Sequence, residues 1–383
     1  MKHRFPSDRD LFDSQLKHFV PPDSFDAHAH LYRQDDAISG LPESAENGQG
    51  QSGWKEYCHN LELWMGDLRP SAGLFFAIPK PTLNRPVANQ FILSELADQP
   101  GSRALLLVTP KDSPDEVETL IKSGNYVGFK VYHVYADRAD TLQAEPHEYI
   151  PEWVWELSNQ YSLAIMLHMV RDRAIADPIN QTYIRNHCLQ YPHAKLILAH
   201  AARGFCGNHT VEGIASLRAL DNVFFDTSAI CESQPFEAIL REFGTTRLMF
   251  GTDFSVSEIY GRCVSIGDGF LWLGEQNVNW DTATFASPNR VGLESLLALK
   301  QACHTLRLID ADVERIFCHN ARKLLDIQPE SARNLTQETY QRAKQLIPGG
   351  TQLLSKRPEM FAPDCWPAYY REANGCEVID LDG

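Results

Sequence analysis

Eight short apolar runs recur along the chain, and each closes on a polar residue before a longer segment with a helix-compatible pattern. The apolar positions within a run are continuous rather than alternating, which is typical of strands buried on both faces of a parallel sheet. Strand followed by helix, repeated eight times, predicts an α/β fold of the (β/α)8 TIM-barrel type. The runs are SFDAHAH, AGLFFAIP, RALLLVTP, YVGFKVY, LAIMLH, KLILAH, NVFFDTS and RLMFGTD.

The segments between the runs carry helix signals. SPDEVETLIKSG, residues 113–124, has a serine at the N-cap position, proline in the first turn, early acidic residues and a closing glycine, so we expect a crossover helix there. A doubly wound open sheet is the main alternative fold. No glycine-rich phosphate loop follows the first strand, which favours the barrel.

Two stretches interrupt this rhythm. Residues 35–60, after the first strand, are predicted to form a long loop that leads to a helix, and residues 255–290, after the eighth, a second long loop on the same rim of the barrel. The barrel pattern ends near residue 330. We therefore expect an N-terminal extension over 1–22, a barrel over 23–330 and a C-terminal extension over 331–383.

Charge and composition narrow the class of protein. The net charge is -15 and basic runs are lacking, so nucleic acid is not expected as a partner. The N-terminus lacks a secretion signal and no stretch approaches the ~18 apolar residues of a membrane helix, which indicates a cytoplasmic protein and no membrane partner. The nine cysteines never form C-x-x-C, so neither a disulfide framework nor a thiolate zinc site is indicated. The sequence leaves open whether the protein forms a homo-oligomer.

Residues able to bind a metal or move a proton close five of the eight runs. Side chains two apart on a strand leave from the same face, so the paired histidines of the first strand can converge on one object. A single histidine at such a position is more often an ordinary hydrogen-bonded core residue, but the combination favours a site at the C-terminal rim. Three imidazoles and one carboxylate form a normal zinc set, which also suits iron or manganese. The residues are His28, His30, Lys130, His168, His200 and Asp253.

The strand-one H-x-H, LAIMLH, KLILAHAARGF, VFFDTSA, RLMFGTDFS and VERIFCHNARKLL together resemble the amidohydrolase superfamily, specifically its amidohydrolase-2 branch of metal-dependent TIM-barrel hydrolases and decarboxylases. The resemblance covers about residues 23–325. It implies one divalent metal ion, most simply Zn²⁺, and a catalytic histidine at His200. The usual G-[ST]-D-x-P becomes GTDFS here, so Ser255 replaces the proline. The implied metal ligands are His28, His30, His168 and Asp253.

Lys130 and three further residues are candidates for binding substrate. Arg171 and Arg203 follow site histidines closely, and a guanidinium near a metal makes most sense for an anionic small-molecule substrate, because it pairs bidentately with a carboxylate. For either arginine alone, a surface or loop residue without such a role is the alternative. We place Trp54 in the same pocket. In some superfamily branches a strand-four lysine is carboxylated and bridges two metals, and Lys130 could do so, but a structural or substrate-facing lysine is the favoured interpretation.

These residues predict hydrolysis of an amide, ester or lactone in a carboxylated substrate. Asp253 would accept a proton from the attacking water, while His200 would help to polarise the carbonyl. Two alternatives stay open: a non-hydrolytic decarboxylase on the same barrel, and a metal-free scaffold.

The tail resembles a different family. AKQLIPGG, residues 343–350, and the final ANGCEVIDLDG resemble the N-terminal arm of class III PLP-dependent aminotransferases. The resemblance stops where a cofactor domain would begin, so PLP binding by this chain alone is not expected. It implies a fused or associated aminotransferase as a partner. The alternative is a C-terminal helix and hairpin with chance similarity.

Overall fold

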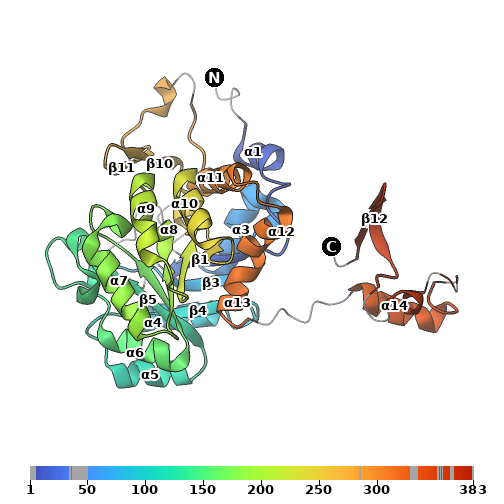
Figure 1. The fold of residues 1–383 in the computed structure, drawn as a ribbon, viewed down its shortest axis with the longest axis horizontal. Coiled ribbons are helices and arrows are strands. Elements are labelled where there is room, and N and C mark those ends of the chain that lie inside the picture. The colour runs from blue at the N-terminus through green and yellow to red at the C-terminus, as the bar shows by residue number, and fades with distance from the viewer. Residues whose placement is uncertain are drawn as a thin grey trace. The chain divides into compact units, whose positions relative to one another are not determined.

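The computed structural model describes residues 6–33, 36, 51–283, 286–327, 335–351, 353, 355, 357–362 and 366–381. The chain divides into two compact units, Met1–Asp326 and Ile327–Gly383 (Figure 1).

The larger unit is built on one sheet, in which neighbouring strands are parallel except for the antiparallel edge strand β2. Its order is β2-β1-β3-β4-β5-β6-β7-β8-β9. Each of the predicted apolar runs contains one of the parallel strands, so the α/β prediction is confirmed. The strands are β1 (Phe25–Arg33), β2 (Gln51–Ser52), β3 (Ala72–Ala77), β4 (Arg103–Leu107), β5 (Tyr126–Tyr132), β6 (Ala164–His168), β7 (Lys195–Leu198), β8 (Val223–Asp226) and β9 (Leu248–Met249).

Backbone hydrogen bonds bring the last strand against the first. The amide of Ala27 donates to the carbonyl of Phe250 (2.8 Å), and that of Asp253 donates to the carbonyl of His28 (2.8 Å). His30 donates to Phe254 (2.7 Å), next to a parallel bridge between Ala29 and Phe254. The sheet therefore curls until the carboxyl ends of β1 and β9 meet, as in a TIM barrel.

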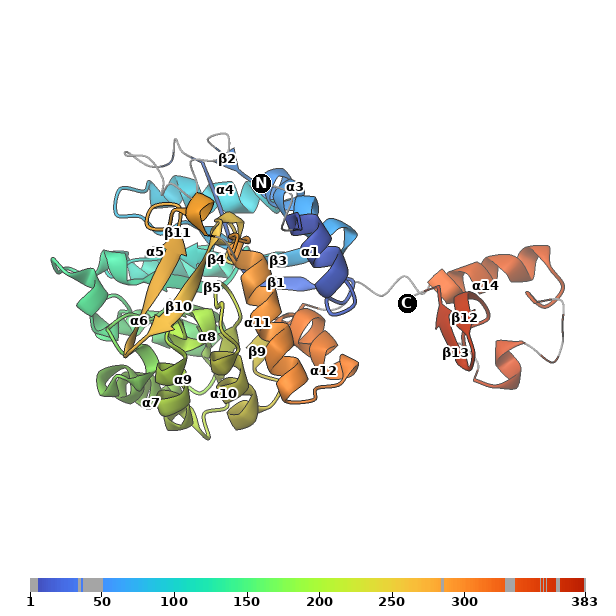
Figure 2. The same ribbon diagram turned by 90° about the horizontal axis from the view of Figure 1, so that it is seen from above.

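Helices follow the strands and surround the sheet (Figure 2). The crossover helix predicted over 113–124 is α5. The helices of the larger unit are α1 (Asp8–Gln15), α3 (Trp54–Met65), α4 (Arg85–Glu95), α5 (Pro114–Lys122), α6 (Glu152–Tyr161), α7 (Pro178–Gln190), α8 (Ala199–Arg203), α9 (Gly207–Gly213), α10 (Ser233–Phe243), α11 (Val291–Thr305), α12 (Asp310–Glu314) and α13 (Asn320–Leu324), with a π-helical turn (Arg315–His319) before α13.

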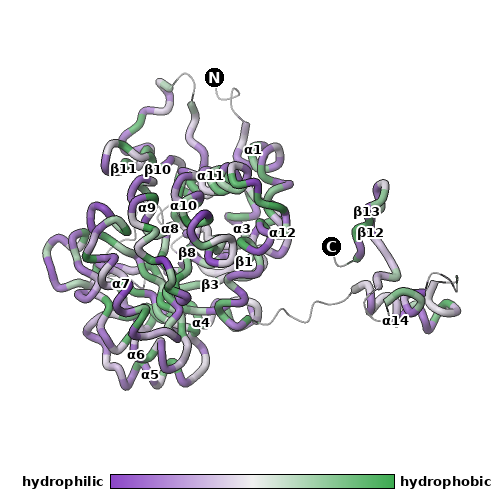
Figure 3. The backbone as a smooth tube through the Cα atoms, in the orientation of Figure 1, coloured by the Kyte–Doolittle hydropathy of each residue, from purple (hydrophilic) through white to green (hydrophobic). Residues whose placement is uncertain are grey.

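The strands are buried on both faces, as their continuous apolar pattern predicts. Every residue of β3 is buried, and so are the first eight residues of β1. Figure 3 shows the hydrophobic residues gathered towards the middle of this unit. The sheet leaves no room for a side chain at Gly128, where a Cβ would lie 2.0 Å from the carbonyl oxygen of Ala164.

The two predicted long loops differ in content. Most of the first, residues 37–50, lies outside the described residues. The second contains a two-stranded antiparallel hairpin, β10 (Gly261–Ile266) and β11 (Gly269–Gly274), which the sequence analysis assigned to loop.

The smaller unit contains α14 (Leu335–Leu346) and the hairpin β12 (Tyr370–Asn374) with β13 (Glu377–Asp380). Its buried side chains include Tyr340, whose hydroxyl donates to Glu359 (2.7 Å). Within the ranges given above, no helix has the length and apolar character needed to cross a membrane.

Candidate active site

Strands β1 and β9 bring three of the predicted ligands together. The Nε2 atoms of His28 and His30 each lie 3.4 Å from Oδ1 of Asp253. One ligand atom from each residue lies within 4.8 Å of the others, and all three residues are buried. Because His28 and His30 are two positions apart on β1, their side chains leave from the same face.

The hydrogen-bond partner of Nδ1 determines which nitrogen of each imidazole carries the proton. Nδ1 of His28 lies 2.9 Å from a carboxylate oxygen of Asp226, and Nδ1 of His30 lies 3.3 Å from the carbonyl oxygen of Ala77. Both partners can only accept, so each Nδ1 carries the hydrogen. Each Nε2 then presents a lone pair towards Asp253.

Three acceptor atoms therefore face one another in a buried space. Burial, together with the nearby charge of Lys130, lowers the pKa of His28 to about 3, and burial also lowers the pKa of His30. Both imidazoles are neutral at pH 7. Facing lone pairs repel unless a cation lies between them, and neutral imidazoles with a carboxylate are a zinc-type donor set. The donor chemistry thus fits a divalent metal ion.

Asp253 is the charged member of this group. Burial alone would raise its pKa, but the imidazoles of His200, His28 and His30 outweigh that effect and hold the pKa below its usual range. The residue has a left-handed backbone conformation (φ 57°), which is uncommon outside glycine and occurs often at functional sites. Asp253 is therefore ionised and held in one orientation.

Lys130, on β5, points at the same place. Its Nζ lies 3.5 Å from Nε2 of His28 and 4.5 Å from the ring centroid of Phe76, and the side chain is fully buried. Burial lowers its pKa to about 8 against the opposing effect of Asp253 and Asp226. Lys130 is thus part of the site.

His168 and His200 form a second pair beside the first. Nδ1 of His168 lies 3.0 Å from Nε2 of His200, and Nδ1 of His200 lies 3.8 Å from Oδ2 of Asp253. Burial and the neighbouring His200 lower the pKa of His168 well below its usual value. The structure places His168 against His200 rather than within the compact group of His28, His30 and Asp253, so its role as a ligand stays a prediction.

His200 begins a left-handed turn. Residues His200, Ala201, Ala202 and Arg203 all have φ between 50° and 60°. Such a conformation costs roughly 1–2 kcal/mol for each non-glycine residue. The turn is held by the amide of His200, which donates to Asp226 (2.9 Å), and by the amide of Gly204, which donates to His200 (2.7 Å).

The hairpin β10–β11 covers this turn. The Phe205 ring stacks on His200 (centroids 5.4 Å apart) and contacts Phe270 and Trp272 of β11. The guanidinium of Arg203 lies over the Phe270 ring (5.4 Å), and its Nε is buried without a hydrogen-bond partner. Burial lowers the pKa of Arg203, although it stays a cation.

The other two predicted substrate residues have different surroundings. The guanidinium of Arg171 already donates to Asp177 (2.8 Å) and to the carbonyl of Gln143 (3.2 Å). The Trp54 ring stacks on Tyr57 (5.5 Å) and meets Phe75 edge-on (5.6 Å). Substrate contact by Arg171 and Trp54 stays a prediction.

Two buried carboxylates at the site were not predicted from the sequence. Asp226 ends β8 and contacts both His28 and His200. Asp26 accepts hydrogen bonds from Tyr57 (2.9 Å) and from Thr252 (2.5 Å), and so ties β1 to the segment that carries Asp253. Asp226 closes the seventh apolar run just as His200 closes the sixth, and that position was the available signal.

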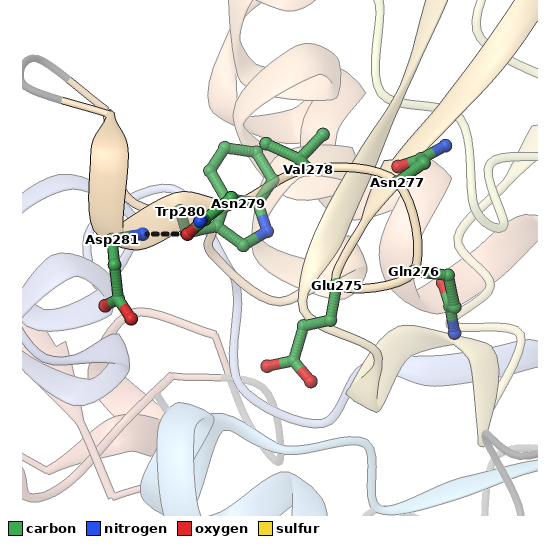
Figure 4. Close-up of a pocket in the computed structure, with 7 residues that line it drawn as sticks. All are labelled: Glu275, Gln276, Asn277, Val278, Asn279, Trp280 and Asp281. Atoms are coloured by element: carbon green, nitrogen blue, oxygen red, sulfur yellow. Dashed lines mark hydrogen bonds between the residues drawn. The ribbon is translucent and has the colours of Figure 1, made fainter.

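A separate hollow lies in the segment after β11 (Figure 4). It is formed by residues 275–281, where the side chain of Asn279 accepts a hydrogen bond from the amide of Asp281 (3.1 Å). Its lining contains none of the predicted site residues.

A family model described as "Amidohydrolase" matches residues 25–327. The chain belongs to the amidohydrolase family. This match confirms the resemblance stated above and covers the barrel together with all of the candidate site. A search of curated proteins gives no significant match.

Solved structures support the fold of this amidohydrolase. An amidohydrolase from Burkholderia multivorans with bound HEPES has a TM-score of 0.54 at 15% identity, covering 80% of this chain and 99% of that one. A second crystal form of that protein, with bound zinc, gives 0.52 at 14% over the same shares. A probable 2-pyrone-4,6-dicarboxylic acid hydrolase from Acinetobacter baumannii, with bound citric acid, gives 0.51 at 13%, covering 80% and 100%. At these identities the likeness establishes the TIM-barrel fold alone.

Family membership confirms that this chain is an enzyme of a metal-dependent type. Family membership does not determine the reaction, the substrate or the identity of the metal.

Proposed function

We propose that this amidohydrolase is a metal-dependent hydrolase that cleaves an amide, ester or lactone in a small carboxylated substrate. The observation that carries the proposal is the convergence of His28, His30 and Asp253, with neutral imidazole lone pairs and one carboxylate facing the same buried point. His168 completes the proposed ligand set, and Zn²⁺ is the metal that this set suits best. Zinc bound to the relative from Burkholderia multivorans supports this choice.

A divalent ion held there supplies Lewis acidity and lowers the pKa of bound water. The chain's own residues account for the proton transfers. Oδ1 of Asp253 faces the two β1 histidines, which leaves Oδ2, on the side of His200, to accept a proton from the attacking water. The same carboxyl can then pass that proton to the leaving group.

His200 is the residue that we propose to stabilise the reacting carbonyl. Its ring lies between Asp253 and the Phe205 cover, and Ser228 holds its Nδ1 (2.9 Å to Oγ). Charge develops on the carbonyl oxygen during attack, and a fixed polar group in a buried site stabilises that charge strongly.

Arg203 supports an anionic substrate. The half-buried guanidinium of Arg203 donates from Nη1 to the carbonyl of Arg171 (2.9 Å), but its buried Nε is unpaired and gains a charge-assisted hydrogen bond if a carboxylate binds there. The Phe270 ring beside the guanidinium lowers the local polarity, which strengthens that interaction. The dicarboxylic acid in the name of the Acinetobacter baumannii relative, and the citric acid bound to it, are of the same chemical class.

Metal analysis and a substrate panel test the proposal. We expect one equivalent of a divalent ion by mass spectrometry after gentle purification, and its loss in Asp253→Asn. The panel begins with 2-pyrone-4,6-dicarboxylic acid and extends to carboxylated esters and amides, with acid release followed by an indicator dye. A wild-type protein without stoichiometric metal contradicts the proposal and favours the scaffold alternative.

The alternative reaction is decarboxylation on the same barrel, with the same ligands. Released CO₂, measured in the same reactions, separates the two. CO₂ without a ring-opened or cleaved product would replace hydrolysis with decarboxylation.

We further propose that the smaller unit connects this hydrolase to a PLP-dependent aminotransferase. Support comes from its sequence resemblance and from its surface, which exposes several large apolar side chains: Leu346, Leu353, Met360, Phe361, Trp366, Tyr370 and Val378. An apolar surface of this kind is typical of a segment that packs against another protein part. An open reading frame that continues past codon 383 into an aminotransferase supports the fusion, and a stop codon followed by no such gene contradicts it.

A further inference from the structure

Asp226 holds two site histidines at once. It is fully buried at the end of β8, and Oδ2 accepts the Nδ1–H of His28 (2.9 Å). Oδ1 accepts from the amide of His200 (2.9 Å) and from both the amide (3.1 Å) and the hydroxyl (2.5 Å) of Ser228. One carboxylate thus touches the proposed ligand of β1 and the backbone of the proposed catalytic turn.

The geometry alone leaves a different role open, because His28, His200 and Asp226 also form a compact buried group able to hold a metal. The hydrogen bonds argue against that role. Oδ1 already accepts three donors, and the 2.9 Å contact to Oδ2 uses the Nδ1 side of His28, away from Asp253. Oδ1 of Asp226 is thus fully engaged, and Oδ2 accepts the proton of His28 rather than sharing a metal with it.

We propose that Asp226 is a positioning residue, which fixes the tautomer of His28 and the orientation of the His200 turn; this inference rests on the proposed function. A carboxylate only accepts, so the His28 proton must stay on Nδ1 and Nε2 must stay free for a metal. The same carboxylate holds a backbone conformation that Ala201 and Ala202 would otherwise avoid.

The decisive variant is Asp226→Asn, which keeps the shape and adds an amide donor. An amide N–H facing Nδ1 moves the proton of His28 to Nε2 and blocks the lone pair. We expect zinc affinity, measured by competition with a chromophoric chelator, to fall about 10- to 100-fold. Asp112→Asn is the matched control, since it makes the same exchange at a carboxylate that pairs with Arg85 outside the site, and it should change zinc affinity by less than about threefold.

A second measurement reads the tautomer directly. In protein labelled with ¹⁵N-histidine and freed of metal, long-range ¹H–¹⁵N spectra should show His28 as the Nδ1–H form, with its signals assigned by their loss in His28→Gln. Asp226→Asn should convert these signals to the Nε2–H form. If that variant does not fold, the wild-type spectrum still decides, because an Nε2–H form of His28 overturns the proposal.

These measurements distinguish failure of the proposed function from failure of the positioning role of Asp226. A wild-type protein that binds no zinc but shows His28 as Nδ1–H contradicts the proposed function and supports the positioning. A wild-type protein that binds zinc, with unchanged affinity in Asp226→Asn, overturns the positioning alone.

Discussion

At the scale of single residues, the positions of the protons on the imidazoles determine what the site can bind. Each imidazole on β1 donates through Nδ1 to an acceptor outside the site, so the Nε2 lone pairs converge on Asp253. Lys130 supplies a buried positive charge at the same point. An ammonium and a divalent cation repel at this distance, and the low effective dielectric of a buried site strengthens the repulsion.

Replacing Lys130 tests whether it opposes or assists the metal. Lys130→Met keeps most of the buried side-chain volume and removes the charge 3.5 Å from His28. We expect zinc affinity to rise at least about tenfold, since this removes a like charge from the site. Titration of metal-free protein against a competing chelator measures it. Loss of metal from this variant would instead identify Lys130 as a group that holds metal.

His200 is proposed to act on substrate rather than to hold the metal. His200→Ala should abolish turnover of any carboxylated ester or lactone that the wild type cleaves, because the group next to the carbonyl is gone, while the bound metal is retained. Metal content and rate are measured on the same preparation. His304→Ala, at an exposed position on α11, is the control and should leave both unchanged. Metal loss in His200→Ala would make this residue a ligand.

At the scale of elements, the strand ends carry the site and the loops complete it. Gly251 lies where β9 meets β1, and a Cβ there would sit 3.0 Å from Cβ of His28 and 3.5 Å from Cβ of Ser228. The distance to His28 is tight enough that His28 must shift by a few tenths of an ångström, whereas the distance to Ser228 is ordinary contact. The close approach of the last strand to the first therefore depends on a residue without a side chain.

Gly251→Ala should move His28 away from Asp253 without unfolding the barrel. We expect zinc affinity to fall roughly tenfold, comparable to other changes that disturb the orientation of a metal ligand. Gly269→Ala is the control, because its Cβ would find only the carbonyl oxygen of Ile266 at 3.9 Å. Equal affinities in the two variants would mean that the contact at Gly251 does not position His28.

The strands could be predicted from sequence because burial on both faces leaves a local, continuous apolar pattern. The grouping of the residues at the strand ends could also be predicted, because parallel strands present their carboxyl ends on one rim. The role of Asp226 could not be predicted, because its partners His28 and His200 lie 198 and 26 positions away.

The hairpin β10–β11 and the left-handed turn at His200 were missed for other reasons. Gly267 and Asp268 form the two-residue connection between β10 and β11, a pair of residues that favours hairpins, so a signal was present. Alanine carries no preference for a left-handed turn, so Ala201 and Ala202 gave none.

At the scale of the whole molecule, the site links the first and last strands of the barrel. His28 and Asp253 are more than two hundred positions apart, and their segments meet only where the sheet curls round on itself. A cation that binds both segments therefore binds the folded barrel and not the unfolded chain. Such binding stabilises the fold by mass action.

Removal of the metal should therefore lower the thermal stability of the barrel. At a free Zn²⁺ concentration of 100 times Kd, binding adds about 2.7 kcal/mol, which raises Tm by roughly 5 °C for a domain of this size. Scanning calorimetry of chelated protein, with and without added zinc, measures this shift for the larger unit. Asp253→Asn removes the charged ligand, so its Tm should respond little to zinc. An equal shift in wild type and variant would place the stabilising zinc elsewhere on the protein and would separate it from the strand closure at β1 and β9.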